Sequence, residues 1–183
     1  MKITIINATP KTGWEVYESS LFDAVDKLAS EHEINLFTIR EMDINFCCGC
    51  WNCWVKTPGQ CVFKDGMDDI LATYPEADFF IFASPIKTGF LTSETKKVMD
   101  RCIPLVLPLI KLFDGECHHP QRYENEPVLG LLLYDDGPEK ESVDIIFSTI
   151  DRFSLNFHSN RTFKTLVKPE SIKEVLQNEI SYN

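Results

Sequence analysis

Four cysteines are the residues of this sequence best suited to chemistry, and their spacing is Cys47-x2-Cys50-x2-Cys53-x7-Cys61. The first three thiols are each separated by two residues, so they can surround a compact inorganic core, and the fourth can close the coordination from a short loop. The irons of an iron–sulfur cluster are held by four deprotonated thiolates. The spacing therefore predicts an iron–sulfur site with Cys47, Cys50, Cys53 and Cys61 as metal ligands.

The same cysteines allow three other interpretations, which the sequence leaves open. A structural zinc site also uses four cysteines, although it usually draws them from two separated Cys-x2-Cys pairs. A Cys-x2-Cys pair in an α/β protein is also a thiol–disulfide redox motif. Finally, the cysteines can be small buried apolar residues.

The composition limits the partners and the surroundings of the protein. The chain has 183 residues and a net charge of −10, from 18 basic and 28 acidic side chains. This charge argues against nucleic acid or an anionic membrane as the main partner, and no apolar run approaches the length of a bilayer span. Seven cysteines, an odd number, do not resemble a secreted disulfide framework. We therefore expect a single cytoplasmic domain, residues 1–183.

Short apolar runs alternate with segments of helical periodicity along the chain. The predicted strands are 2–7, 34–39, 78–83, 128–134 and 161–167. The expected helix starts are Ser19 or Ser20, Asp65, Thr92 or Ser93, Pro138 and Pro169. Strands that alternate with helices form a parallel sheet covered on both faces. We predict an α/β fold, a flavodoxin-like three-layer sandwich with a five-stranded parallel sheet of order 2-1-3-4-5.

This architecture binds ligands at the carboxyl ends of its strands, beside the switch in strand order. The loops after the first, third and fourth strands should therefore line one site. The cysteine-rich loop, residues 43–65, follows the second strand and is expected to emerge at the same edge. An insertion without a clear period, residues 108–127, precedes the fourth strand. We thus predict that the loops and the cysteines form a single pocket.

The loop after the first strand has a composition suited to a phosphate group. Hydroxyls and exposed amides precede a helix N-terminus, where free N–H groups and the helix dipole favour an anion. Glu15 and Glu18 lie in the same loop and would repel a phosphate unless they point outward. An ordinary strand-to-helix connection with a serine cap is the alternative. The residues assigned to the phosphate are Thr9, Lys11, Ser19 and Ser20.

The loop after the third strand can present backbone N–H and C=O groups to the edge of a planar ring. Lys87 would add positive charge near a reduced, anionic ring, or it is a solvated loop lysine. The turn at 134–138 would cover the other face of the ring. The residues assigned to the ring are Ser84, Pro85, Ile86, Lys87 and Gly89. No general acid or base is assigned.

Four stretches of the sequence carry a resemblance to a known family. They are KITIINATPK, NFCCGCWNCWVKTPGQCVFKDGMDDI, ADFFIFASPIKTGFLTSETKKVMDR and HHPQRY, all within residues 1–134. Together they resemble the iron–sulfur flavoprotein branch of the flavodoxin-like, NAD(P)H-dependent FMN reductase superfamily. Three features depart from that family: Ala8-Thr9-Pro10-Lys11 replaces its usual Gly-Ser-Pro-Arg, Lys87 stands where an aromatic is common, and the gap before Cys61 is long.

The resemblance implies non-covalently bound FMN, electron transfer and a homo-oligomer, a dimer or tetramer. The leading hypothesis is an FMN-dependent oxidoreductase or electron-transfer flavoprotein with a 4Fe-4S cluster, which exchanges electrons with a small-molecule or protein partner, NAD(P)H being the implied donor. The second hypothesis is a metal-free NAD(P)H:FMN or quinone-type reductase with structural cysteines. The third is a flavodoxin-like binding module that has lost FMN.

Overall fold

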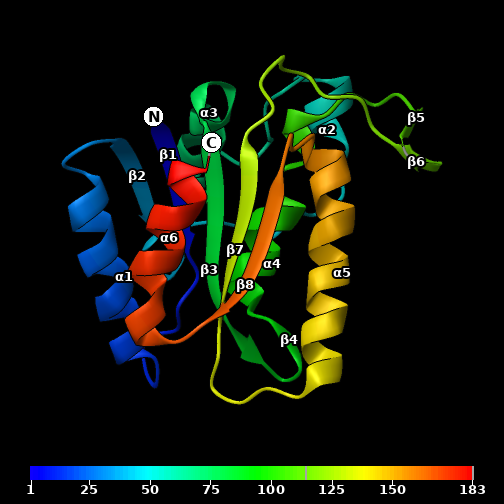
Figure 1. Cartoon of the computed structure of the whole chain (residues 1–183). Helices are drawn as coiled ribbons and strands as arrows, with labels where there is room; N and C mark the ends of the chain where they lie inside the picture. The colour runs from blue at the N-terminus through cyan, green and yellow to red at the C-terminus, as the bar shows by residue number, and fades with distance from the viewer. Residues whose placement is uncertain (114, 183) are drawn as a thin grey trace.

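The computed structural model describes residues 1–113 and 115–182 and has a central sheet with helices on both faces (Figure 1). The order of the main sheet is β2-β1-β3-β7-β8, and all of these neighbours are parallel. The strands are β1 (Lys2–Asn7), β2 (Glu33–Thr38), β3 (Phe79–Lys87), β7 (Val128–Tyr134) and β8 (Thr162–Val167). Because β7 and β8 are the fourth and fifth parallel strands along the chain, the predicted 2-1-3-4-5 order is confirmed.

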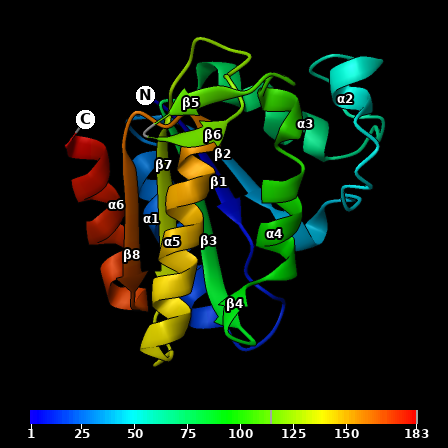
Figure 2. The same ribbon diagram turned by 90° about the vertical axis from the view of Figure 1, so that its right-hand side faces the viewer.

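The helices form the two outer layers. Among the described residues the α-helices are α1 (Glu15–Leu28), α2 (Asn52–Val55), α3 (Met67–Thr73), α4 (Ser93–Asp100), α5 (Lys140–Phe157) and α6 (Ile172–Ser181). Short 3-10 turns are η1 (Ile39–Glu41), η2 (Tyr74–Glu76), η3 (Ile103–Leu105) and η4 (Pro169–Ser171). Helices α1 and α6 cover one face of the sheet, and α4 and α5 cover the other (Figures 1 and 2). No helix in the described part of the chain is long and apolar enough to cross a membrane.

The central strands are buried on both faces, which explains their nearly continuous apolar sequences. In β3, Phe79 and Ile81 pack toward α1 and α6, whereas Phe80 and Phe82 pack toward α4 and α5. In β7, a Cβ atom on Gly130 would lie only 2.3 Å from the ring of Phe163 in β8. The absence of a side chain at this position therefore lets the aromatic ring cross the strand.

The first helix begins earlier than the sequence predicted. Helix α1 starts at Glu15, so Ser19 and Ser20 lie in its second turn and neither caps it. The predicted serine cap is wrong because the apolar stripe of this helix extends back to Tyr17. The ring of Tyr17 stacks on that of Tyr134 with a centroid separation of 4.7 Å.

The third strand is longer than predicted and ends in a hairpin instead of a loop. Strand β3 continues to Lys87 and pairs antiparallel with β4 (Phe90–Leu91). The two residues between them, Thr88 and Gly89, have φ angles of 52° and 79°. Positive φ at both positions is the requirement of a two-residue type I′ hairpin turn. The predicted ring-edge loop is therefore mostly paired backbone.

The insertion contains a second, small sheet. Strands β5 (Lys111–Phe113) and β6 (Glu116–His118) pair antiparallel and are not part of the main sheet. This pair lies at the end of the molecule opposite β4 (Figure 1). The insertion therefore adds surface to the amino-end side of the parallel strands.

Candidate functional site

A cavity of about 340 Å³ lies at the carboxyl ends of β3 and β7. The β3–β4 turn forms one wall, through Ile86 and Gly89, and the loop between β7 and α5 forms the other, through Asp136 and Gly137. Its volume is within the range of roughly 300–1,000 Å³ that ligand sites have. Because backbone and short side chains dominate the lining, the cavity suits the edge of a flat ring. We call it the carboxyl-edge cavity.

The five residues assigned to the ring have different environments. Ile86 and Gly89 line the carboxyl-edge cavity. Ser84 and Pro85 are buried, and the Ser84 hydroxyl donates to the Pro85 carbonyl oxygen at 3.0 Å and accepts from a threonine hydroxyl of α4 at 2.9 Å. Lys87 is exposed and is not part of the lining. The side chain of Ser84 therefore holds β3 against α4, which leaves Ile86 and Gly89 to contact a ring.

The loop after β1, which the sequence assigns to a phosphate, makes most of its hydrogen bonds within the protein. The Thr9 N–H donates to the side-chain oxygen of Asn7 at 3.1 Å, and the Thr9 hydroxyl shares a hydrogen bond of 3.0 Å with Tyr134. The Thr9 carbonyl oxygen accepts from Arg40 at 3.1 Å. Buried and fully engaged, Thr9 fixes the loop to β7 and η1. Lys11 is exposed, as a phosphate partner would need to be.

The anion position at the start of α1 is occupied by a carboxylate of the chain itself. The Gly13 N–H donates to Glu15 Oε1 at 3.0 Å. Hydrogen bonds from the N–H groups of Glu15 and Gly13 lower the pKa of the Glu15 carboxyl below its ordinary value. These amides are the groups that would hold a phosphate at a helix N-terminus. In this conformation a phosphate would have to displace Glu15.

Glu18 is turned away from the phosphate position. It accepts a hydrogen bond of 2.6 Å from Asn7 and forms an ion pair with Arg40. Its charge is therefore neutralised beneath the loop. Ser19 and Ser20 lie in the second turn of α1, so their backbone N–H groups are inside the helix and are not free to bind a phosphate as predicted. Taken together, the ring half of an FMN site fits the structure, and the phosphate half does not fit while Glu15 remains in place.

The five cysteines of the cysteine-rich loop surround one small cavity. Its lining includes Cys47, Cys48, Cys50, Cys53 and Cys61, with apolar walls from Trp51, Phe63 and Ile103. Burial, and then the nearby thiols of Cys61 and Cys47, raises the pKa of Cys53. Among the described residues no three His, Cys, Asp or Glu side chains already stand at the positions of metal ligands. The chemistry of the donor set, four thiols around one apolar-walled cavity, nevertheless fits the predicted cluster.

The local backbone explains how the thiols gather. Gly49 and Trp51 have φ angles of 64° and 58°, so the chain turns sharply twice between Cys48 and α2. For Trp51, which has a Cβ, the left-handed conformation is strained. The ring of Trp51 packs on that of Trp54 at 4.8 Å, and the Trp54 indole N–H donates to Val106 O at 3.0 Å. These contacts hold the loop against the segment that follows α4.

A buried ion pair anchors both ends of the cysteine-rich loop. Arg101, after α4, donates from its two terminal nitrogens to the two carboxylate oxygens of Asp65, at 2.9 and 3.0 Å, and to Asn45 O at 2.7 Å. The side chains of Arg101 and Asp65 are 1% and 3% exposed. Burial by itself would raise the pKa of Asp65, but hydrogen bonds from Arg101 and Asn45 lower it well below its ordinary value. The loop is therefore fixed to the C-terminal end of α4.

The cysteines and the carboxyl-edge cavity lie at opposite ends of the molecule. Helix α4 begins beside β4 and ends at the cysteine-rich loop, and both views separate α2 from β4 (Figures 1 and 2). The two cavities have no lining residue in common. The expectation of one shared pocket within the chain is therefore wrong. The loop leaves β2 at the carboxyl edge, but the Arg101–Asp65 pair draws it back along α4.

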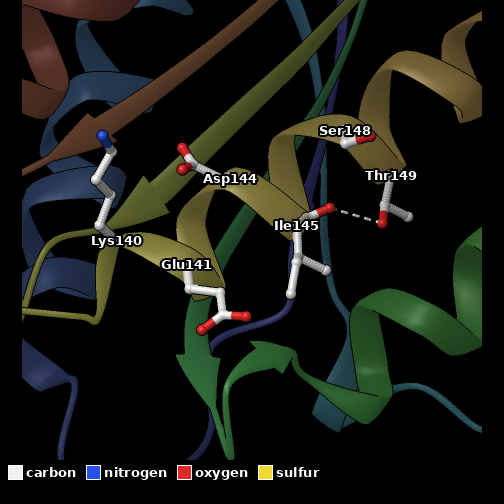
Figure 3. A pocket seen from close by; sticks show the side chains of 6 residues that line it. All are labelled: Lys140, Glu141, Asp144, Ile145, Ser148 and Thr149. Carbon is white, nitrogen blue, oxygen red and sulfur yellow. Dashed lines mark hydrogen bonds between the residues drawn. The ribbon is translucent and has the colours of Figure 1, made fainter.

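Two further cavities differ in character. The depression on α5 in Figure 3 is lined by six side chains of one helix, including Lys140, Glu141 and Asp144, and is open to solvent. One helix cannot enclose a ligand, so we assign it no role. A cavity of about 450 Å³ lies beside the cysteines, between the cysteine-rich loop, the end of α4, the insertion and the end of α5. We call it the aromatic cavity, because Trp51, Trp54 and two phenylalanines line it.

The sheet order and the position of the carboxyl-edge cavity define a flavodoxin-like fold, and solved structures share it. An NAD(P)H:quinone oxidoreductase from Methanothermobacter marburgensis matches with a TM-score of 0.65 and 11% identity, over 98% of this chain and 92% of the other. An FMN-dependent NADH-azoreductase from Bacillus anthracis, solved with FMN, matches with a TM-score of 0.56 and 14% identity, over 99% and 94%. At these identities the comparison shows the fold.

The family model for NADPH-dependent FMN reductase matches residues 1–131. The chain therefore belongs to this family. A protein named iron–sulfur flavoprotein from Methanocaldococcus jannaschii is 32% identical over 83 residues, which are 45% of this chain and 41% of the relative. One of the same name from Clostridioides difficile is 28% identical over 128 residues, 68% of this chain and 55% of the relative. The chain thus spans about half the length of the curated relatives it matches.

Proposed function

We propose that this chain is an FMN-dependent oxidoreductase that takes electrons from NAD(P)H, binding the flavin ring in the carboxyl-edge cavity. The observation that carries the proposal is this cavity, formed at the strand ends of a chain that belongs to the FMN reductase family. Bound FMN would supply hydride acceptance and one-electron transfer. The protein's own part is to place Ile86 and Gly89 at the ring edge and to keep the β3–β4 turn rigid.

We propose further that Cys47, Cys50, Cys53 and Cys61 hold an iron–sulfur cluster, which would supply one-electron transfer. Four thiols around one cavity support this proposal, as do relatives named iron–sulfur flavoproteins. Trp51 and Phe63 would place apolar side chains beside the cluster. We also propose that residues 1–183 form a single domain and that the protein acts in the cytoplasm as a homo-oligomer.

Two alternatives each have an observation in their favour. A metal-free reductase with structural cysteines is supported by the carboxyl-edge cavity and the family match, neither of which requires a metal. A module that has lost FMN is favoured by Glu15 on the amides at the start of α1. The deciding experiment is anaerobic purification followed by absorbance, iron and acid-labile sulfide measurement. We expect flavin bands with broad cluster absorption and iron. Flavin without iron would support the metal-free reductase, and a colourless protein that does not bind added FMN would overturn the proposal.

A further inference from the structure

The aromatic cavity has the size and lining of a small-molecule site, and it adjoins the cavity between the cysteines, with which it shares Cys47, Gly49, Trp51 and Ile103. Its volume of about 450 Å³ exceeds that of the carboxyl-edge cavity. Its aromatic lining comes from two segments, the cysteine-rich loop with Trp51 and Trp54, and α5 with Phe153 and Phe157. Aromatic side chains that line a cavity favour a flat ring, because offset and edge-to-face ring contacts are favourable.

Three polar side chains occur in this lining, and two of them offer defined hydrogen-bonding atoms. His119 Nδ1 lies 2.7 Å from Leu109 O. A carbonyl oxygen can only accept, so Nδ1 carries the proton and the Nε2 of the neutral ring is an acceptor. Asn156 Oδ1 accepts from the backbone N–H of His119 at 3.4 Å, which leaves the Asn156 amide NH₂ as a donor. The third, Asp100, forms an ion pair with Lys96.

The charges around the cavity favour a neutral ligand. Asp100 is the one formally charged residue in the lining, and the chain as a whole carries −10. Burial keeps the Cys102 thiol protonated, with its pKa raised to about 12, and this thiol donates to Val98 O. An anionic ring would therefore lose its hydration without gaining a cation in the lining.

We propose that the aromatic cavity binds an uncharged, planar aromatic compound that carries a carbonyl or hydroxyl group, such as a quinone or a naphthol. The ring lies against the tryptophan and phenylalanine side chains, a ligand hydroxyl donates to His119 Nε2, and a ligand carbonyl accepts from the Asn156 amide. Cys47, a proposed cluster ligand, lines the same cavity. A role of this compound in electron transfer rests on the proposed function, whereas its binding does not.

The test is calorimetric titration of the full chain, purified without flavin or iron, with 2,3-dimethyl-1,4-naphthoquinone. Both ring positions that react with thiols are blocked in this probe, so the exposed cysteines cannot add to it. We expect saturable binding with one site per chain. Asn156→Trp, which fills the cavity, should weaken binding at least tenfold, and Asn156→Leu, which removes only the donor, should weaken it several-fold. Ser148→Trp, on the exposed side of the same helix, is the matched control and should bind like the wild type.

A charge comparison completes the test. We expect 2-naphthol to bind and 2-naphthoate, the same ring system with a carboxylate, to bind at least tenfold more weakly. The absence of saturable quinone binding to the wild type would overturn the proposal, as would unchanged binding in a folded Asn156→Leu variant or equal binding of the two naphthalenes. Because neither cofactor is present in these titrations, their failure would leave the flavin assignment untouched.

Discussion

The two ends of this molecule use different chemistry to build a site. At the carboxyl edge, Thr9 and Glu18 hydrogen-bond to Asn7 and Glu15 accepts from the Gly13 N–H, and a small cavity lies nearby between the β3–β4 turn and the loop after β7. At the other end, sulfur and aromatic rings surround two cavities, and one ion pair, Arg101–Asp65, is buried beneath them. The comparison teaches that the carboxyl-edge cavity and the cavity between the cysteines are built independently within the chain. Helix α4, eight residues and about 12 Å long, separates them.

The largest expected effect is a loss of stability that begins at the cysteine-rich end of the molecule. Asp65→Ala leaves the Arg101 guanidinium buried without its partner, and removing one member of a buried pair costs about 3–5 kcal/mol. We expect a loss of this size in the free energy of unfolding, measured by urea titration. Asp68→Ala, which removes an exposed partner of Lys64, is the control and should cost less than about 1 kcal/mol. A cost below about 1 kcal/mol for Asp65→Ala would mean that the pair does not anchor the loop.

The same pair predicts a pH dependence. The folded-state pKa of Asp65 is depressed, whereas in the unfolded chain it is about 3.9. The stabilisation from the ionised carboxylate is therefore fully present above about pH 5 and is lost as the pH falls through the folded-state pKa. The difference in unfolding free energy between the wild type and Asp65→Ala should stay constant from pH 8 to pH 5 and shrink below about pH 4. A difference that grows in acid would contradict the depressed pKa.

The smallest expected effect is a change in FMN affinity at the carboxyl edge. Glu15→Gln removes the charge that competes with a phosphate for the amides at the start of α1, so FMN should bind several-fold more tightly by flavin fluorescence titration. Riboflavin, which lacks the phosphate, should bind with unchanged affinity. Glu18→Gln is the matched control, because Arg40 and Asn7 already hold Glu18 beneath the loop. Equal tightening by both variants would show a general charge effect instead of a local one.

The sequence predicted the sheet well because the evidence for it is local. Each central strand is a short apolar run buried on both faces, and the alternation of strands and helices predicts a parallel sheet. The early start of α1 also has a local signal, since Tyr17 lies four residues before Leu21 in the buried stripe. The extension of β3 also has a local signal, because Gly89 supplies the positive φ that the second position of a two-residue hairpin turn requires.

The position of the cysteines could not be predicted in the same way. It depends on Arg101 contacting Asp65 and Asn45, residues 36 and 56 positions away along the chain. The aromatic cavity likewise joins Trp54, His119 and Asn156 from three distant segments. No periodicity within one segment reports such contacts. The assignment of Lys11 to a phosphate remains a prediction. The sequence did not indicate that the Glu15 carboxylate contacts the amides at the start of α1.

The separation of the two ends is tested most directly by flavin and iron content per chain in anaerobically purified Cys53→Ser, beside the wild type and Cys48→Ser. The account predicts that Cys53→Ser keeps its flavin and loses its iron, and that Cys48→Ser keeps both. Joint loss of flavin and iron from a folded Cys53→Ser protein would contradict it.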